Sequence, residues 1–501
     1  MDTLSSRAKA RDLRFEPYHA PVVFALGLFL RLWLIHTYPP VFGDDSVTRL
    51  FLHDRISIAH SLPALQASIF LLTKISDDIF AARAWMALIG AVAGVGCYYL
   101  AADLMGRSGG LVAALLFAVN PFLVAYSTVP YQEILMLTGL FFAFHFYFVE
   151  RWVASSLSLG LACLARYEAW PACAVLAASY VLKHGISPMA GLRAAILFGW
   201  APLAWVGWHG GLSPAGTYVL EVSPSPARLW RYVYLGWITA KFTHIPALLL
   251  AGAGGWLVFR QGLLLQSRFR VVAVFLALFL LSIVFSAHGD PRDQVRFVTA
   301  REAHLPISAV AVLAGLGWPR WQRLRWVLVA AGVLLGLWGS DRFLARETSQ
   351  PRLQLATRVA GYLDRAVSSE QTALLLARPI PAEGVRAFLD RASRTGGEPN
   401  RRKAAEVLEQ TGGTAPEFQR TAVHCRRARQ RLRTLTSPAV SPARRREQIA
   451  AGLPDWIVLW SDFAPEDSED ARLREIAVAN GPPAATFRAD SMVVEIYRIR
   501  R

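Results

Sequence analysis

Two adjacent carboxylates, Asp44 and Asp45, stand in the stretch Phe42-Gly43-Asp44-Asp45-Ser46. Like charges this close repel each other, so one of the two is pushed towards taking up a proton near neutral pH. Accepting a proton from a substrate hydroxyl is a natural use for such a pair. A solvated turn explains the pair equally well, because Gly-Asp-Asp-Ser is also favourable turn chemistry.

Three more charged residues stand where apolar segments begin or meet. Glu133 falls at the expected start of an apolar helix, where the helix dipole favours a carboxylate and where an acid also occurs for purely structural reasons. Arg166 and Glu168 form a charged island between two short apolar segments. Ionisable residues in such surroundings point to function, although these two charges could simply neutralise each other.

A cluster of arginines lies between residues 288 and 306. Arg292, Arg296 and Arg301 can present forked N–H donors to phosphate oxygens, and His288 begins the same segment. An ordinary polar loop explains any one of them, but the cluster favours a phosphate site. The histidines lack the HExxH-type spacing of a zinc site, so we predict no dedicated zinc site and assign no metal ligands; those considered are His53, His60, His288 and His304.

The elements that carry these residues are apolar runs that recur from Pro21 to about Trp338. A helix of about 20 residues crosses the roughly 30 Å hydrocarbon layer, so the runs predict about 11 transmembrane helices. The first helix is expected to be retained, because it carries Arg31 and ends in Tyr38-Pro39-Pro40 instead of a cleavage site. The spans are expected near 19–38, 82–103, 111–127, 132–149, 153–165, 168–182, 190–208, 244–260, 271–287, 305–318 and 326–340.

Charge indicates the orientation of these helices. Only 18% of the residues are charged, yet the formal net charge is +17, and the surplus in the apolar part falls in short breaks on alternate connections. The positive-inside rule predicts a multi-pass protein of the inner (plasma) membrane, with a cytoplasmic N-terminus and an extracytoplasmic C-terminal domain. The same parity puts the candidate residues on the outer face. No basic, aromatic-interleaved soluble face accompanies the charge, so we predict no nucleic-acid binding.

The apolar runs stop after Ser340, which predicts a transmembrane domain over 1–340 and a small extracytoplasmic α/β domain over 341–501. The very basic stretch from His424 to Arg446 is typical of a solvated helix or loop, with contact to lipid phosphate or an acidic polymer as the alternative. The four cysteines have no CxxC spacing and are interpreted as packing residues. Helices are expected at Leu353–Val367 and Arg402–Gln410 and, in the first outer loop, along the interface at Ser61–Ile75; strands are expected at Thr372–Leu376, Trp456–Trp460 and Met492–Ile499.

The order of these features along the chain is informative in itself. A basic N-terminus and a first span with Arg31 precede the doublet Asp44-Asp45. A juxtamembrane arginine, Arg83, follows in Ala81-Ala82-Arg83-Ala84-Trp85, and Leu161-Ala-Cys-Leu-Ala-Arg-Tyr-Glu168 comes later. Over roughly residues 1–340 this order resembles the GT-C glycosyltransferase superfamily, in particular the branch of protein O-mannosyltransferases and lipid A aminoarabinose transferases.

The resemblance implies a GT-C-like fold and roles for individual residues. In that superfamily the first acid of the doublet is the catalytic carboxylate, which here is Asp44, and Asp45 stands where glutamate is more usual. Glu133 matches the outer acid after the third span, and Arg166 matches a basic residue that meets the carrier phosphate. The expected substrate- and phosphate-binding group comprises Glu133, Arg166, Glu168, Arg83, His288, Arg292, Arg296 and Arg301.

The implied activity is an inverting transfer of a sugar from a polyprenyl-phosphate carrier to an acceptor hydroxyl at the extracytoplasmic face. The expected partners are the polyprenyl-phosphate-linked sugar donor and the lipid bilayer. No cofactor is assigned, and a requirement for a divalent cation is left open. The sugar and the acceptor class, whether lipid, glycan or protein, are also left open.

Two other interpretations compete with a transferase. A membrane transporter or exporter of a lipid-linked or glycan substrate would place charged sites near the bilayer midplane, between two related halves. This sequence shows no repeated half, and its polar clusters fall at one face. A scaffold or polymer-export partner, whose carboxylates are merely structural, is the third interpretation.

Overall fold

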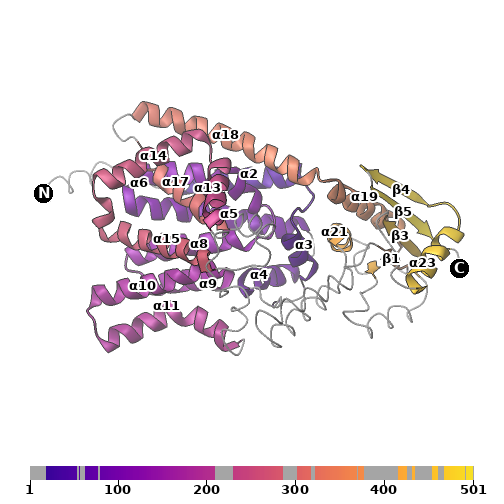
Figure 1. Cartoon of the computed structure of the whole chain (residues 1–501), viewed down its shortest axis with the longest axis horizontal. Helices are drawn as coiled ribbons and strands as arrows, with labels where there is room; N and C mark the ends of the chain where they lie inside the picture. The colour runs from indigo at the N-terminus through magenta and orange to yellow at the C-terminus, as the bar shows by residue number, and fades with distance from the viewer. Residues whose placement is uncertain are drawn as a thin grey trace. The chain divides into compact units, whose positions relative to one another are not determined.

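The computed structural model shows a mostly helical chain with a small β-sheet (Figure 1). Of Asp44 and Asp45 the structure describes the backbone alone. The structure describes residues 18–53, 56, 62–76, 79–208, 229–285, 302–317, 322–368, 371–376, 416–425, 432–434, 454–460, 468–490 and 492–499. His288, Arg292, Arg296 and Arg301 lie outside the described residues, as do the expected helix at Arg402–Gln410 and most of the basic stretch from His424 to Arg446.

The chain divides into two compact units. The first, the helical unit, comprises Met1–Thr37, Ala84–His209 and Leu220–Phe343. The second, the mixed unit, comprises Tyr38–Arg83, Gly210–Val219 and Leu344–Arg501. The segment that follows the first helix therefore belongs to the same compact unit as the C-terminal part of the chain. The predicted domain boundary at residue 340 stays a prediction.

In its described residues the helical unit consists largely of apolar helices. Gly139 in α8 is one reason for its tight packing, since a Cβ there would lie 2.6 Å from the carbonyl oxygen of Ser158 in α9. A Cβ at Gly254 in α14 would lie 2.0 Å from the carbonyl oxygen of Leu313 in α17. The helices are α2 (His19–Thr37), α5 (Ile79–Met105), α6 (Arg107–Ala118), α7 (Pro121–Tyr126), α8 (Gln132–Phe148), α9 (Trp152–Ala165), η2 (Tyr167–Ala169), α10 (Trp170–His184), α11 (Pro188–Trp208), α13 (Leu229–Phe242), α14 (Ile245–Arg260), η4 (Leu263–Leu265), α15 (Ser267–Phe285), α17 (His304–Ala314) and α18 (Gln322–Thr348).

Four helices among the described residues are long and apolar enough to cross a membrane, namely α2, α5, α11 and α18. A fifth span results if Tyr232–Phe242 and Ile245–Arg260, which bend by 120° at their break, are one span. The other apolar helices in this part of the chain are shorter. Several apolar helices are therefore present where the sequence predicts them, while the count of about 11 spans stays a prediction.

The span expected near 111–127 is divided in the structure. α6 ends at Ala118, and α7 begins at Pro121. The Oδ1 atom of Asn120 accepts hydrogen bonds from the N–H groups of Phe122 (3.1 Å) and Leu123 (3.2 Å). An asparagine N-cap followed by proline at the first helical position starts a new helix, so the Asn-Pro pair interrupts the apolar run.

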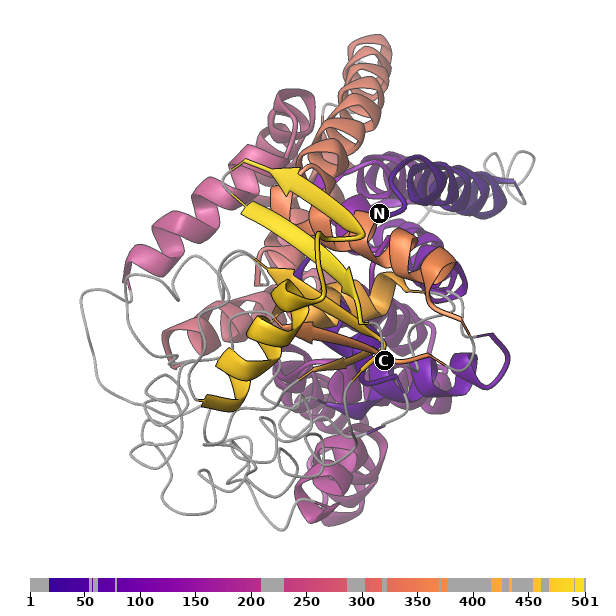
Figure 2. The same ribbon diagram turned by 90° about the vertical axis from the view of Figure 1, so that its right-hand side faces the viewer.

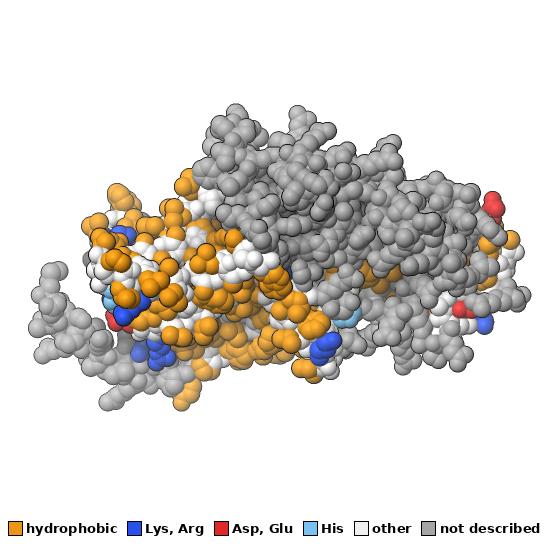
Figure 3. All heavy atoms as spheres, turned by 90° about the horizontal axis from the view of Figure 1, so that it is seen from below, with side chains coloured by type: hydrophobic (Ala, Val, Ile, Leu, Met, Phe, Trp, Pro, Cys, Tyr) orange, Lys and Arg blue, Asp and Glu red, His pale blue; other side chains and the backbone are white. Residues whose placement is uncertain are grey.

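The outer face of α11 shows how apolar the surface of the helical unit is. Met189, Leu192, Ile196 and Leu203 recur at helical spacing, and each is more than half exposed. In Figure 3 the described part of the surface seen from below is largely hydrophobic, with few charged side chains. An apolar surface of this extent is expected for contact with lipid.

The basic connections predicted to share one side of the membrane meet at one end of the helical unit. Arg268 Nη1, at the start of α15, donates to the carbonyl oxygen of Asp103 near the end of α5 (3.0 Å). Asp103 also pairs with His145 near the end of α8 (2.7 Å). Lys183 at the end of α10 pairs with Glu150, just after α8 (2.5 Å). These contacts bring the ends of α5, α8 and α10 and the start of α15 together, and the side of the membrane that they face stays a prediction.

The mixed unit contains a five-stranded sheet with the order β2-β1-β3-β5-β4. Figure 2 shows part of this sheet, with its C-terminal strands in yellow. β1 is parallel to β2 and β3, whereas β5 is antiparallel to β3 and β4. The three predicted strands are confirmed by β1, β3 and β5, and two predicted helices are confirmed by α4 and α19. The elements are α3 (Asp44–Phe51), α4 (Pro63–Thr73), α19 (Pro351–Ala366), β1 (Ala373–Leu376), α21 (Pro416–His424), β2 (Leu432–Thr434), β3 (Trp456–Trp460), α23 (Ser468–Ala479), β4 (Ala485–Ala489) and β5 (Met492–Arg498).

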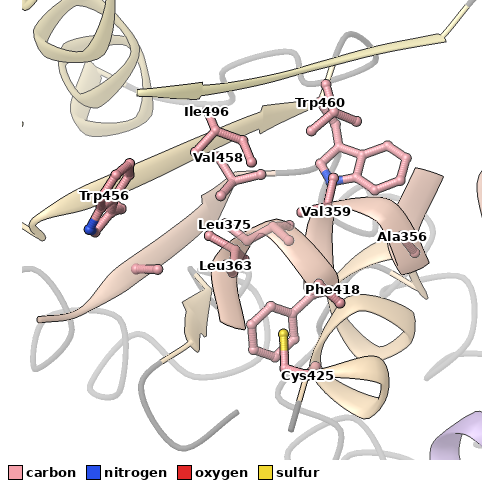
Figure 4. Close-up of a cluster of buried hydrophobic side chains, with 14 of the residues drawn as sticks. Ala356, Val359, Leu363, Leu375, Phe418, Cys425, Trp456, Val458, Trp460 and Ile496 are labelled. Carbon is pink, nitrogen blue, oxygen red and sulfur yellow. The ribbon is translucent and has the colours of Figure 1, made fainter. Parts of the chain in front are cut away.

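The core of the mixed unit lies between the sheet and the helices α19 and α21 (Figure 4). Every residue of β3 is buried, which explains its unbroken apolar sequence. Val458 and Trp460 point towards this core, where they meet Phe418 and Cys425 of the α21 region. Ile457 alternates to the opposite face of the sheet. Cys425 is thus a packing residue, as predicted.

Candidate functional site

The acidic pair begins helix α3. Asp44 and Asp45 are its first two residues, where the positive end of the helix dipole favours carboxylates. Gly43 precedes them with φ 80° and ψ 125°, a left-handed conformation that favours glycine. The Ser46 hydroxyl donates to the carbonyl oxygen of Gly43 (2.9 Å) and also contacts that of Phe42. The Gly-Asp-Asp-Ser stretch is therefore the start of a helix.

Arg83 holds the chain just before this helix. It is 1% exposed, and its Nη1 donates to the carbonyl oxygens of Tyr38 (2.8 Å) and Pro39 (2.6 Å). The expected role of Arg83 in binding a carrier phosphate stays a prediction. Both of these hydrogen bonds go to main-chain oxygens of the segment that leads to the acidic pair.

His424, at the end of α21, contacts the same segment. Its Nε2 accepts a hydrogen bond from the N–H of Val41 (3.0 Å), and its Nδ1–H donates to the carbonyl oxygen of Arg420 (2.6 Å). Burial lowers the pKa of His424 to about 4, and the positive charges of Arg83 and Arg420 act in the same direction against the hydrogen bond to the Arg420 carbonyl. The imidazole is therefore neutral near pH 7, as an acceptor nitrogen requires.

In the helical unit, Glu133, Arg166 and Glu168 lie together, as the sequence predicted for two of them. Glu133 is in the first turn of α8 and is 2% exposed. Arg166 Nη1 lies 3.1 Å from Glu133 Oε1. Arg166 Nε lies 3.0 Å from Glu168 Oε2, and its Nη2 contacts Glu168 Oε1. The guanidinium thus makes a bidentate, forked contact with the Glu168 carboxylate and also pairs with Glu133.

This cluster carries two carboxylates and one guanidinium, so with all three ionised its net charge is −1. Glu133 Oε2 is buried and has no hydrogen-bond partner in the described part of the chain. A buried carboxylate oxygen of this kind can accept a hydrogen bond from a ligand hydroxyl. Glu133 and His145 lie near opposite ends of the 17-residue α8, about 18 Å apart along the helix axis.

An aromatic group surrounds His304 near the start of α8. The ring centroids of Tyr126 and Tyr131 lie 4.6 Å apart, and those of Tyr126 and His304 lie 5.2 Å apart. The ring centroid of Phe122 also lies 4.7 Å from that of His304. Tyr131 comes two residues before Glu133. The sequence analysis did not assign Tyr126 or His304 to the site, although His304 lies within the 288–306 segment that it singled out.

A metal site does not emerge from the described residues: they contain no group of three or more His, Cys, Asp or Glu side chains that could hold an ion. The other site residues predicted from sequence, Arg292, Arg296, Arg301 and His288, lie outside the described residues. The structure therefore brings together Glu133, Arg166 and Glu168 in one unit, and it gives the backbone context of the acidic pair in the other.

Comparison with known proteins identifies the fold. No family model matches the sequence, and no curated protein matches it. The structure is similar to that of ArnT from Cupriavidus metallidurans bound to undecaprenyl phosphate, with 11% identity and a TM-score of 0.60 over 96% of this chain and 98% of that one. Apo ArnT from the same organism gives 11% identity and a TM-score of 0.56 over 95% and 97%. ArnT is a lipid A aminoarabinose transferase of the GT-C superfamily, so the expected GT-C-like fold is confirmed.

Proposed function

We propose that this protein is an inverting glycosyltransferase that moves a sugar from a polyprenyl-phosphate carrier to an acceptor hydroxyl. One combined observation carries the proposal. The chain has the fold of ArnT, a protein that binds undecaprenyl phosphate, and its apolar helical unit holds the Glu133–Arg166–Glu168 cluster at one helix end. An apolar bundle gives a long prenyl chain somewhere to lie, and charged groups at its end suit the phosphate and the sugar.

The chemistry assigns one step to each group. Asp44 accepts the proton of the acceptor hydroxyl while that oxygen attacks the anomeric carbon. The bond from the anomeric carbon to the phosphate oxygen breaks, and the polyprenyl phosphate leaves with the bonding electrons. Arg166, with Arg296 or Arg301, stabilises the negative charge that grows on the phosphate. A single displacement inverts the anomeric centre.

We also propose the membrane arrangement that this chemistry needs. The protein crosses an inner (plasma) membrane with about 11 spans, its N-terminus is cytoplasmic, and the C-terminal domain is extracytoplasmic. The shorter helices α8, α9 and α10 count as spans in this arrangement. Basic side chains that meet at the Glu150–Lys183 end of the helical unit support it, because the positive-inside rule puts that end in the cytoplasm.

The acidic pair gives the direct test of the transferase. Asp44→Asn keeps the size of the side chain but cannot accept the proton, so turnover should fall by about 10² or more. Asp45→Asn should cost less if Asp45 only orients its neighbour or the acceptor. Purified protein would be assayed for sugar transfer from polyprenyl-phosphate donors to a panel of acceptors. Undiminished transfer by the double variant Asp44→Asn, Asp45→Asn would disprove the mechanism.

A transporter or exporter of a lipid-linked or glycan substrate is the second candidate. One observation favours it: helices are interrupted at Asn120 and at the 120° bend between Tyr232–Phe242 and Ile245–Arg260. Transporters build substrate sites from interrupted helices of this kind. In proteoliposomes a transporter would move an intact lipid-linked sugar across the bilayer without an acceptor, whereas the transferase would release polyprenyl phosphate only when an acceptor is present.

A further inference from the structure

Helix α21, from the C-terminal part of the chain, contacts the acidic segment at three places. The first is the hydrogen bond from the N–H of Val41 to His424 Nε2, over a sequence separation of 383 residues. Val41 is fully buried, and a buried main-chain N–H needs a partner. His424 is that partner, and its own Nδ1–H is satisfied by the Arg420 carbonyl within α21. The ring is thus fixed in one orientation by contacts on both nitrogens.

The other two contacts hold α3 itself. The Thr48 hydroxyl donates to Gln419 Oε1 (2.9 Å). The rings of Phe51 and Phe418 meet edge to face with their centroids 5.7 Å apart, and Phe51 packs against the core of the mixed unit. Contacts therefore run from the start of α21 to its end and touch the acidic segment both before and after the pair.

Arg83 also holds the segment before the acidic pair. Arg83 donates to the carbonyl oxygens of Tyr38 and Pro39, so it acts two to three residues before Val41, whose N–H is bonded to His424. Between these two contacts and the start of α3 only Phe42 and Gly43 remain. Hydrogen bonds this close together along the chain can hold a following side chain within the positional tolerance that catalysis needs.

We propose that α21 is a positioning element for the acidic pair, with His424 and Gln419 as positioning residues that fix where Asp44 presents its carboxylate. This inference rests on the proposed function, because it takes Asp44 as the base. His424 and Gln419 touch neither donor nor acceptor in this role. They act through the main chain of Val41 and through α3. The C-terminal part of the chain is then needed for the proton-transfer step itself.

The size of the expected effect follows from geometry. A misplacement of a catalytic group by about 1 Å can cost about 10²-fold in rate. Loss of a positioning contact should lower kcat, because the base is no longer held at the acceptor hydroxyl. The KM for the polyprenyl-phosphate donor should stay within about twofold, since we assign the carrier phosphate to arginines that α21 does not hold.

The test compares two substitutions of one residue. His424→Leu removes the acceptor for the Val41 N–H, and kcat should fall by about tenfold or more with donor KM unchanged. His424→Gln can put an amide oxygen near the position of Nε2, and it should recover most of the wild-type kcat. The matched control is Ile457→Ala, which weakens the opposite face of the same sheet and should leave kcat per folded molecule unchanged.

Three outcomes would overturn the inference. They are a wild-type kcat for His424→Leu, an equally low kcat for His424→Leu and His424→Gln, and a rise in donor KM that accounts for the whole loss. The Asp44→Asn variant is assayed in parallel. If Asp44→Asn is fully active, the proposed function fails; if it is inactive while His424→Leu is fully active, the positioning role alone fails.

A second comparison covers the case in which His424→Leu does not fold. Thr48→Val and Gln419→Leu each remove one end of the same hydrogen bond, and a double-mutant cycle on kcat measures their coupling. Under the inference the double variant loses no more than the worse single variant. Strictly multiplicative losses would mean that this hydrogen bond does not position α3, and they would overturn the inference.

Discussion

At the scale of single residues, Arg166 is the most informative position. It forms a fork on the half-buried Glu168 and contacts the buried Glu133, and the proposed function asks it to stabilise the departing phosphate as well. Arg166→Ala should lower kcat/KM for the donor by about 10² or more, the loss expected for one charge-stabilising group. Arg166→Lys should lose less, because lysine keeps the charge but not the fork. Initial rates at limiting donor measure both.

A double variant separates the phosphate role from mere charge balance. Arg166→Ala leaves the buried Glu133 and the half-buried Glu168 without their shared positive partner, which is destabilising by itself. Adding Glu168→Gln removes one of those charges and should restore folding. Transfer should stay low in the double variant if Arg166 serves the phosphate. Wild-type transfer there would remove Arg166 from the phosphate site.

Some of these residue contacts could be predicted from the sequence, and others could not. Arg166 and Glu168 are two positions apart in a polar island, so their pairing follows from local spacing. The contact of Val41 with His424 spans 383 residues and involves a main-chain N–H, which leaves no trace in residue type. Arg83 was predicted to belong to the phosphate-binding group, but its hydrogen bonds to the main-chain carbonyl oxygens of Tyr38 and Pro39 could not be predicted from residue type.

At the scale of elements, local patterns predicted what depends on local physics. The buried strand β3 was predicted from its run of β-favouring residues, and the amphipathic helix α19 from its helical periodicity. The break at Asn120 was missed because the residues on both sides are apolar, so the N-cap asparagine and the proline after it lie within one apolar run. The strands β2 and β4 were missed too, and the sheet order β2-β1-β3-β5-β4 depends on contacts between segments far apart in sequence. Hydrophobic period alone does not specify such an order.

The link between α21 and the acidic segment should make stability depend on pH. Burial lowers the pKa of His424 to about 4, below the ordinary value of 6.5. Between these values the unfolded chain binds a proton that the folded chain does not, so stability is fully present above pH 6.5 and is lost as pH falls towards 4. The full loss is roughly 3 kcal/mol, from ~1.4 kcal/mol per pH unit. Unfolding in detergent at pH 7, 6 and 5 would measure it.

His424→Gln is the control for this pH dependence, because glutamine does not titrate. Its stability should fall less than that of the wild type between pH 7 and pH 5. Identical pH dependence in the two proteins would mean that protonation of His424 does not limit stability. The comparison needs no substrate, so it stands apart from the transferase assay.

At the scale of the whole molecule, the compact units do not follow the order of the chain. Residues 38–83 belong to the same unit as residues 344–501, although the helical unit separates them in sequence. The sequence analysis divided the chain at residue 340 because apolar composition changes there, and composition does not report on which segments pack together. A deletion after residue 343 therefore removes the packing partner of α3 along with the C-terminal sheet.

The proposed orientation in the membrane belongs to this scale and can be tested on the full-length chain. Ile186, in the turn between α10 and α11, is 86% exposed and follows the basic Lys183 that the positive-inside rule puts in the cytoplasm. Thr486 is exposed on β4 of the mixed unit, which we assign to the outer face. A membrane-impermeant thiol reagent applied to intact spheroplasts should label Thr486→Cys at once and Ile186→Cys only after the membrane is opened. The wild-type protein, whose cysteines are buried except for the half-buried Cys173, gives the background. Labelling of Ile186→Cys before Thr486→Cys would mean that the orientation is the opposite of the proposed one. The acidic pair would then not lie on the face where an extracytoplasmic acceptor must be.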